Sequence, residues 1–320
     1  MYSRIEYISS RKYGQSPEER DISTLLNEGV VIIDKPRGPT SHQVAAWVKD
    51  ILEVPLAGHG GTLDPKVTGV LPVALNKATK CIESLRYGQK EYYGIMHLHQ
   101  SVSMNELTEI LENFKGKIYQ LPPVRASVKR DLRTREIYEF EIVEIDKLDI
   151  LFRVKCEAGT YIRTLCHDIG EALCVGAHMI ELRRTSVGCM SESQSVTLQT
   201  LVDAYTIWKE NNDERLLRKV IQPKEILVEH LKKVIIKDSA VDAICHGAPL
   251  MFSGIVKFNG DLQKDEPIAI LTGKGELVAL GKTCATNNEI RNETKGIACI
   301  PTRVIMKRGV YPRQWKEKGQ

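Results

Sequence analysis

One carboxylate stands out in the sequence because of the residues around it. Asp64 follows three glycines within four positions and precedes Pro65, in the stretch GHGGTLDP (58–65), which runs into the apolar segment KVTGVLPVAL. Glycines allow backbone conformations that other residues avoid, and a proline pushes the residue before it into an extended conformation. We expect Asp64 to be held rigidly at the edge of a strand, either as a turn former or helix cap or as a reactive carboxylate.

Arg163 is a candidate partner for this carboxylate. It lies near the start of a helix expected after Gly159, where a cation opposes the helix dipole, and it is off the apolar stripe that begins at Ile162. It is therefore either a solvated surface arginine or the partner of an anion. That anion would be a phosphate or the carboxylate of Asp64, which the pair would keep ionised in a site that excludes water.

Two further segments carry residues that suit a nucleic acid. Tyr92 and Tyr93 alternate across an expected strand, so only one of them faces a given site, either as a core residue or as a platform for a base. The stretch 125–135 has five basic residues in eleven positions, which fits an exposed charged loop and, better, a grip on phosphates. These residues are Arg125, Lys129, Arg130, Arg133 and Arg135.

Composition and spacing exclude several other classes of protein. With 42% hydrophobic and 27% charged residues and a net charge of +4, the chain permits a polyanionic partner without requiring one. Eight cysteines without a Cys-x-x-Cys pair predict reduced thiols in an intracellular compartment and no zinc site built from this chain alone. No apolar run spans a bilayer, and the N-terminus lacks the apolar core of a signal peptide. The glycine-rich stretch lacks the flanking residues of a P-loop or a dinucleotide fingerprint.

The elements that must position these residues alternate irregularly. Strands and helices are interleaved without a regular βα repeat, which favours an α+β fold over a doubly wound sheet. Either Thr40 or Ser41 can cap the helix that follows them. The other expected elements are strands at 29–33, 138–142 and 152–156, and helices at 107–114 and 162–173.

The composition also predicts two domains. Residues 1–25 are polar and aperiodic, as in an extension. After a shift in composition near 225–233, short strand-like runs separated by turn signals predict a small β-barrel-like domain of roughly 75 residues. These runs lie at 234–236, 255–258, 268–271, 277–280 and 297–300.

Together these segments resemble the TruB-type pseudouridine synthases, and within them the branch of dyskerin and its archaeal homologues. The second domain, with KDSAVDAICHGA (237–248) and TGKGELVALGK (272–282), is similar to a PUA RNA-binding module. The eukaryotic charged extensions are missing, which favours an archaeal source. The matching motifs of the first domain are GVVIIDKPRGPTSHQV (29–44), GHGGTLDPKVTGVLPVAL (58–75), KEYYGIMHLH (90–99), LPPVRASVKRDLRTREIYE (121–139), EAGTYIRTLCHDIG (157–170) and GAHMIELRRTSVG (176–188).

The resemblance implies a fold and a domain layout. It implies a catalytic domain with a mixed, largely antiparallel sheet, joined to a small β-barrel-like PUA domain. The expected ranges are an N-terminal extension at 1–25 packed on the PUA domain, the catalytic domain at 26–228, the PUA domain at 229–308 and a basic tail at 309–320.

The resemblance also assigns roles to residues. Asp64 would be the catalytic aspartate of a uridine-to-pseudouridine isomerisation, attacking C1′ or removing a proton from C2′, and the glycines before it would let a flipped nucleotide approach. Tyr92 would stack on the base and is a candidate to take the C5 proton. Arg163 would pair with Asp64, and Leu182 would pack under the base.

Further positions are assigned to binding. His59 would fill or guide the space that the flipped base vacates, and Lys35, with Pro36, would support the floor of the site as part of the substrate-binding set. The basic segment 121–135 matches the family's thumb loop, so Arg125, Lys129, Arg130 and Arg133 are expected to contact RNA. The reaction is an isomerisation, so no organic cofactor and no metal are expected.

For this branch the resemblance implies a ribonucleoprotein. An H/ACA guide RNA would pair with the target RNA, and the PUA domain would hold the guide's ACA end with help from residues 1–25. The implied protein partners are a small zinc-ribbon-containing protein, a glycine-arginine-rich-protein homologue and a kink-turn-binding ribosomal-type protein, with any zinc held by the partner. Localisation would be cytoplasmic, without a membrane.

Two alternatives use the same residues differently. A stand-alone tRNA synthase acting on the T-loop uridine would share the catalytic residues, but the PUA domain and N-terminal extension favour the guided branch. A catalytically silent RNA-binding scaffold would not need Asp64, Tyr92 and Arg163 together.

Overall fold

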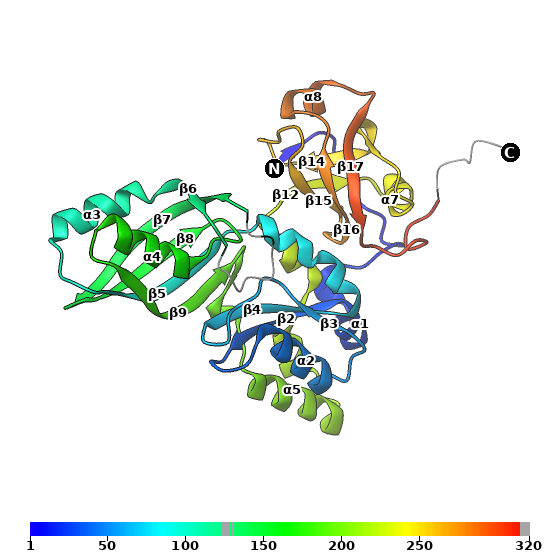
Figure 1. Cartoon of the computed structure of the whole chain (residues 1–320). Helices are drawn as coiled ribbons and strands as arrows, with labels where there is room; N and C mark the ends of the chain where they lie inside the picture. The colour runs from blue at the N-terminus through cyan, green and yellow to red at the C-terminus, as the bar shows by residue number, and fades with distance from the viewer. Residues whose placement is uncertain (123–128, 130, 314–320) are drawn as a thin grey trace.

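A computed structural model of the chain describes residues 1–122, 129 and 131–313. It contains one ten-stranded and one seven-stranded sheet, with helices packed on both. The larger sheet extends across two of the three lobes in Figure 1, and the smaller sheet forms the third, beside the N-terminus. The α+β class and the small second β domain are therefore confirmed. No helix in the described ranges is long and apolar enough to cross a membrane.

The larger sheet is mostly antiparallel and consists of two halves. Its order is β11-β2-β4-β9-β5-β8-β7-β6, with β3 beside β4 and β10 beside β9. The halves meet where β4 and β9 run parallel, paired through Thr68–Arg183 and Gly69–Arg184. The bounds are β2 Gly29–Lys35, β3 Ala57–His59, β4 Thr68–Leu75, β5 Lys90–Leu98, β6 Gly116–Gln120, β7 Arg133–Asp146, β8 Asp149–Cys156, β9 Ala177–Val187, β10 Met190–Ser191 and β11 Ile221–Pro223.

Each half of this sheet is covered by its own helices. The side chains of α2 and α5 share one apolar core with β2 and β4, and those of α3 and α4 share another with β5, β7 and β8. Leu165 and Ile169 on α4 are fully buried, and burying such a side chain contributes roughly 2 kcal/mol. The helices are α1 Ile22–Glu28, α2 Ser41–Ile51, α3 Met104–Asn113, α4 Ile162–Ala172, α5 Leu198–Asn211 and α6 Arg215–Val220, with the 3₁₀ helices η2 Asn76–Tyr87 and η4 Lys224–Val228.

The second domain is built on the smaller sheet, and all five expected runs are strands of it. Its order is β1-β14-β12-β15-β16-β17-β13, with β12 and β15 parallel. Its elements are β1 Tyr2–Ser3, β12 Lys232–Ile236, β13 Leu250–Met251, β14 Ile255–Phe258, β15 Pro267–Thr272, β16 Leu277–Thr283 and β17 Ile297–Val304, with α7 Asp238–Cys245 and α8 Asn287–Asn292.

Residues near both ends of the described chain pack into the two domains, where we had expected an extension and a tail. Strand β1 adds an edge to the smaller sheet by pairing with β14. Helix α1 begins at Ile22, inside the range expected to be an extension, because its apolar side chains pack on the first domain. Tyr311, which we assigned to the tail, is 2% exposed in the core of the second domain, where its ring lies 6.2 Å from that of Tyr13.

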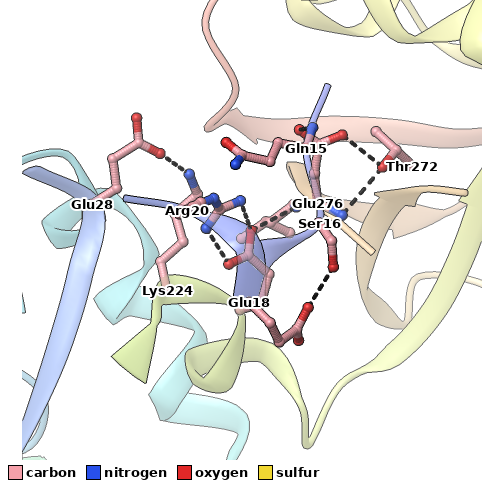
Figure 2. Close-up of polar contacts among 10 residues, drawn as sticks. Gln15, Ser16, Glu18, Arg20, Glu28, Lys224, Thr272 and Glu276 are labelled. Atoms are coloured by element: carbon pink, nitrogen blue, oxygen red, sulfur yellow. Dashed lines mark hydrogen bonds and ion pairs between the residues drawn. The ribbon is translucent and has the colours of Figure 1, made fainter. Parts of the chain in front are cut away.

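A polar network joins the N-terminal segment to both domains (Figure 2). Arg20 donates two hydrogen bonds to the carboxylate of Glu225, at 2.7 and 2.8 Å, and both side chains are largely buried. Glu225 also accepts a hydrogen bond from the backbone N–H of Leu277, at 3.0 Å, and Lys224 pairs with Glu28. The junction between the domains is therefore fixed by charged groups that have partners of opposite sign.

Candidate active site

Asp64 lies on a loop that leads from β3 to β4, next to the place where the two halves of the sheet meet. A turn follows it, closed by a hydrogen bond from the N–H of Val67 to its carbonyl, at 3.0 Å. The side chain hydroxyl of Ser41 holds the preceding residue, since it accepts from the N–H of Leu63 (2.8 Å) and donates to its carbonyl (3.0 Å). Thr40 caps helix α2, which leaves Ser41 for this contact.

Lys35 fixes the other side of the same loop. Its ammonium group donates to the carbonyls of Pro36 (2.9 Å), Pro65 (3.2 Å) and Val67 (2.8 Å), and the side chain is fully buried. Burial lowers the pKa of this lysine, and the nearby Asp64 raises it. Because its three N–H donors are used on backbone carbonyls, Lys35 positions the loop, and its assignment to the substrate-binding set stays a prediction.

Arg163 reaches Asp64 from the opposite half of the sheet. Its Nη2 atom donates to Oδ2 of Asp64 at 2.6 Å, and the two side chains are 58% and 54% exposed. Arg163 is the second residue of α4, where the first turn has no side-chain cap of its own. Gln120, at the end of β6, supplies that cap by accepting from the N–H of Tyr161 and donating to its carbonyl. The loop and the helix thus hold the carboxylate and the guanidinium together at the surface.

An apolar floor lies beside this pair. Leu63, Tyr92 and Leu182 are buried members of one core cluster. Tyr92 is 8% exposed and Tyr93, on the other face of β5, is 36% exposed, so Tyr92 is the one turned to the core. A side chain at Gly94 would collide with Leu182 and Phe152, which explains the glycine between them.

Arg184 is a residue of the site that the sequence analysis missed. It is 1% exposed, and its guanidinium donates to the carbonyls of Val70 (2.8 Å) and Gly61 (3.0 Å). It is the register partner of Tyr92 across strands β9 and β5, and the pKa of Tyr92 is raised by burial and lowered by this arginine. The motif LRRTSVG contains two adjacent arginines, and only the register of β9 reveals that the second points inward.

The glycines before Asp64 make room for the protein's own side chains. A Cβ at Gly60 would lie 2.2 Å from Leu85, and one at Gly61, whose φ is +81°, would lie 3.2 Å from Arg184. We expected these glycines to admit a nucleotide. The space beside Gly60 and Gly61 is instead filled by the protein's own side chains. His59 lies edge-on to His42, with ring centroids 4.6 Å apart, and its pKa is lowered by burial and by the neighbouring cations.

The basic segment is described only in part. Arg125 and Arg130 lie outside the described residues. Lys129 is 83% exposed and pairs with Asp131 at 3.0 Å, and Arg133 begins strand β7 and donates to the carbonyl of Lys129. None of the described basic residues of this segment forms a hydrogen bond or ion pair with Asp64 or Arg163.

The arrangement can perform chemistry with a single carboxylate. It combines a rigidly held Asp64, a guanidinium that fixes one of its oxygens, and an apolar floor that suits a planar ring. Two exposed cations that we had not singled out, Arg37 and Lys66, flank the loop and suit phosphates. No group of three or more His, Cys, Asp or Glu side chains in the described ranges is placed to hold a metal ion.

Comparison with known proteins identifies the family of the chain. The chain matches the models of the TruB family pseudouridylate synthase N-terminal domain (49–162), the tRNA pseudouridylate synthase B C-terminal domain (163–229), the PUA domain (232–305) and the DKCLD domain (1–45). It is 56% identical to a probable tRNA pseudouridine synthase B of Methanocaldococcus jannaschii, over 96% of this chain and 91% of that protein.

Solved structures resemble the whole chain. One is the crystal structure of a Cbf5-Nop10-Gar1 complex, with a TM-score of 0.93 and 51% identity, covering 97% of this chain and 95% of that one. Another is an H/ACA RNP bound to a substrate RNA containing 2′-deoxyuridine, with a TM-score of 0.90 and 49% identity, covering 98% and 96%.

The chain therefore belongs to the TruB family of pseudouridine synthases and is an RNA-modifying isomerase. Within that family, the DKCLD and PUA domains and the similarity to Cbf5 make it an archaeal homologue of dyskerin, as the resemblance predicted.

Proposed function

We propose that the protein converts uridine to pseudouridine at sites chosen by an H/ACA guide RNA, in rRNA and also in tRNA, with Asp64 as the catalytic carboxylate. The observation that carries this proposal is the Asp64–Arg163 pair, held at 2.6 Å beside the apolar floor of Tyr92 and Leu182. Similarity to H/ACA complexes over the whole chain supports the guided form of the reaction.

The reaction moves negative charge from Asp64 to the base. If the carboxylate attacks C1′, the N1–C1′ bond breaks and its electron pair leaves with uracil, which becomes an anion. If the carboxylate instead removes the C2′ proton, a C1′–C2′ double bond forms and uracil leaves with the same charge. The base then turns and C5 bonds to C1′. In the first route this displaces the Asp64 carboxylate from C1′, and in the second Asp64 returns its proton to C2′. Loss of the C5 proton and protonation of N1 complete the isomerisation. Both routes start from the Asp64 carboxylate, whose Oδ2 atom accepts a hydrogen bond from Arg163.

The target uridine must leave its helix before this chemistry. Tyr92 and Leu182 offer an apolar surface that replaces the lost stacking, and stacking on an aromatic ring is worth about 1–3 kcal/mol per base. Tyr92 is also a candidate to take the C5 proton. His59, against His42 on the far side of the loop, would occupy the space that the base leaves.

A basic groove on the second domain suits the guide RNA. It lies between the end of α7 and residues 304–308, has a volume of about 420 Å³ and faces η2 of the first domain. Such a density of cations fits a phosphate backbone. The charged side chains that line it are Lys77, Lys80, Lys307 and Arg308, against Glu28.

We further propose protein partners for this chain. The related structures contain Nop10 and Gar1, and one contains substrate RNA. By this similarity the chain would assemble with a small zinc-ribbon-containing protein, a glycine-arginine-rich-protein homologue and a kink-turn-binding ribosomal-type protein. Its place of action would be the cytoplasm.

A second candidate function is supported by the relatives of this chain. The protein of Methanocaldococcus jannaschii is a probable tRNA pseudouridine synthase B. A guide-free reaction on the T-loop uridine of tRNA would use the same Asp64, Arg163 and Tyr92, so the site itself does not separate the two functions.

Tritium release from RNA that carries 5-tritiated uridine tests the proposal, because forming the C5–C1′ bond expels the label. The assay is run with guide RNA and partner proteins, and in parallel with bare tRNA. We expect release with the guide, reduced at least about 10⁴-fold in Asp64→Asn. Asp203→Asn is a matched control, since this exposed carboxylate lies on α5, and we expect no effect.

Each other result points to a different function. Equal release from bare tRNA would favour the stand-alone tRNA enzyme. Release that survives Asp64→Asn would contradict the assigned carboxylate. An absence of release, with guide RNA still bound, would favour an RNA-binding scaffold.

A further inference from the structure

Three cations around Asp64 and Tyr92 are buried without a carboxylate partner. Lys35, Lys90 and Arg184 are 0%, 5% and 1% exposed, and none of them forms an ion pair with a described residue. Removing a charge from water is costly when no opposite charge compensates it. Three such groups around one site indicate that their charge acts during the reaction and not in the protein without substrate.

The three cations divide between the two sides of the site. Lys35 lies beneath the Asp64 loop and interacts electrostatically with Asp64, so it favours the charge that the carboxylate carries before reaction. Arg184 is the register partner of Tyr92 across β9 and β5 and interacts electrostatically with its hydroxyl, and thus lies on the side where the base would stack.

Lys90 extends the second group. It is two residues before Tyr92 on the same buried face of β5, and it donates to the carbonyls of Leu85 and Gly88. It interacts electrostatically with Arg184. Two positive charges are therefore held near each other in the core beside Tyr92, and backbone carbonyls alone hold them.

We propose that Arg184 and Lys90 form a cationic floor that stabilises the uracil anion released when the N1–C1′ bond breaks, with Arg184 acting through the hydroxyl of Tyr92. This inference rests on the proposed function. In either route, one negative charge leaves Asp64 and arrives on the base. Dipoles and charges that are fixed in advance, in a site that excludes water, favour such a shift without reorganisation. Neither residue touches the substrate, so both are positioning residues.

The alternative is that Arg184 and Lys90 only hold the backbone. Arg184 does tie the carbonyls of Gly61 and Val70, so its removal would disturb the loop under either interpretation. The two roles differ in one respect. A role in stabilising charge depends on how much charge the base must carry, whereas a role in holding the loop does not.

Target RNAs with uridine or 5-fluorouridine at the modified position separate these roles. Fluorine at C5 withdraws electrons and makes the uracil anion more stable, so the enzyme's own stabilisation matters less. The measurement is the single-turnover loss of the target nucleoside, followed by nuclease digestion and chromatography, in the assembled particle. We expect Arg184→Met to slow uridine loss by about 100-fold and 5-fluorouridine loss by about 10-fold, and Lys90→Met to show a smaller effect in the same direction.

Lys35→Met is the matched control. It removes a third buried cation that is also held by carbonyls, but on the Asp64 side, so we expect it to slow both nucleosides by the same factor. Arg184→Lys keeps the charge, so the factors by which it slows uridine loss and 5-fluorouridine loss should lie closer together than those of Arg184→Met. Thermal unfolding would reveal whether Arg184→Met folds. If it does not, Arg184→Lys and Lys90→Met provide the test, through the ratio of the slowing of uridine loss to the slowing of 5-fluorouridine loss.

The outcomes distinguish this inference from the function on which it rests. Equal slowing of both nucleosides by the Arg184 and Lys90 variants, with an active wild type, would overturn the cationic floor and leave the proposed function in place. A wild type that converts neither nucleoside, in guided target or in bare tRNA, would overturn both.

Discussion

Two regions of this protein bury positive charges, and they treat them differently. At the domain junction, Arg20 is paired with Glu225 and Lys224 with Glu28 (Figure 2). Around the candidate active site, Lys35, Lys90 and Arg184 instead donate hydrogen bonds to backbone carbonyls, whereas the ion pair of Asp64 and Arg163 is half exposed.

The difference separates structural charge from functional charge. A buried ion pair is strongly coupled within the folded state, so removing one partner destabilises the protein. An exposed pair contributes little to the free energy of unfolding, so the positions of its two side chains can be set by the reaction. The junction pairs should then control unfolding, and the Asp64–Arg163 pair should control rate.

The largest effect on stability is expected at the junction. Glu225→Gln removes the one carboxylate that is hydrogen-bonded to the buried Arg20 and leaves only the more distant Glu28 and Glu276, so we expect the free energy of unfolding to fall by about 3 kcal/mol, with turnover per folded molecule unchanged. Urea unfolding and single-turnover tritium release measure the two quantities.

A double variant checks the cause of this effect. Arg20→Met with Glu225→Leu removes both charges, and apolar replacement of a buried pair is often neutral, so part of the lost stability should return. If the double variant is no more stable than Glu225→Gln, the loss comes from the hydrogen bond to Leu277 and not from the unpaired arginine.

The opposite result is expected for Arg163→Met. Because the Asp64–Arg163 pair is exposed, the free energy of unfolding should change by less than about 0.5 kcal/mol. The rate should fall by about 100-fold, since a displaced carboxylate loses its alignment with the sugar. Arg163→Lys, which keeps the charge but not the fork of donors, should lie between. An unchanged rate in Arg163→Met would mean that the pair is an ordinary surface ion pair without a role in the reaction.

The sequence predicted the fold and part of the site. The strands, the helices and the two domains followed from periodicity, because apolar residues repeat where they are buried. Arg163 was recognised as a candidate because it lies off its helix stripe, and Asp64 because glycines and a proline surround it.

The remaining parts depend on contacts between distant segments. Arg184 was missed, and Lys35 was singled out only through the resemblance, since nothing local distinguishes a lysine that meets carbonyls 30 residues away from a solvated one. The parallel pairing of Gly69 with Arg184 fixes which of two adjacent arginines turns inward. The glycines before Asp64 were misinterpreted for the same reason, because Leu85 and Arg184 fill the space beside them.

The smallest predicted effect is on the pH dependence of stability, and it tests whether the cations behind Tyr92 are truly unpaired. Burial, and then the neighbouring Arg184, lower the pKa of Lys90 from 10.5 to about 8. Near pH 7 the lysine is charged in both states, and the folded state bears the full cost of burying that charge.

Above pH 8 the folded protein loses this proton while the unfolded chain keeps it to about 10.5, so stability should rise with pH. Relative to Lys90→Met, the wild type should gain about 2 kcal/mol between pH 7 and pH 10, measured by urea unfolding of both proteins. Cys156, the other titratable group beside Lys90, stays neutral over this range because burial raises its pKa to about 12. Parallel stability curves for the two proteins would mean that Lys90 keeps an ordinary pKa, and that its charge is compensated after all, as those at the junction are.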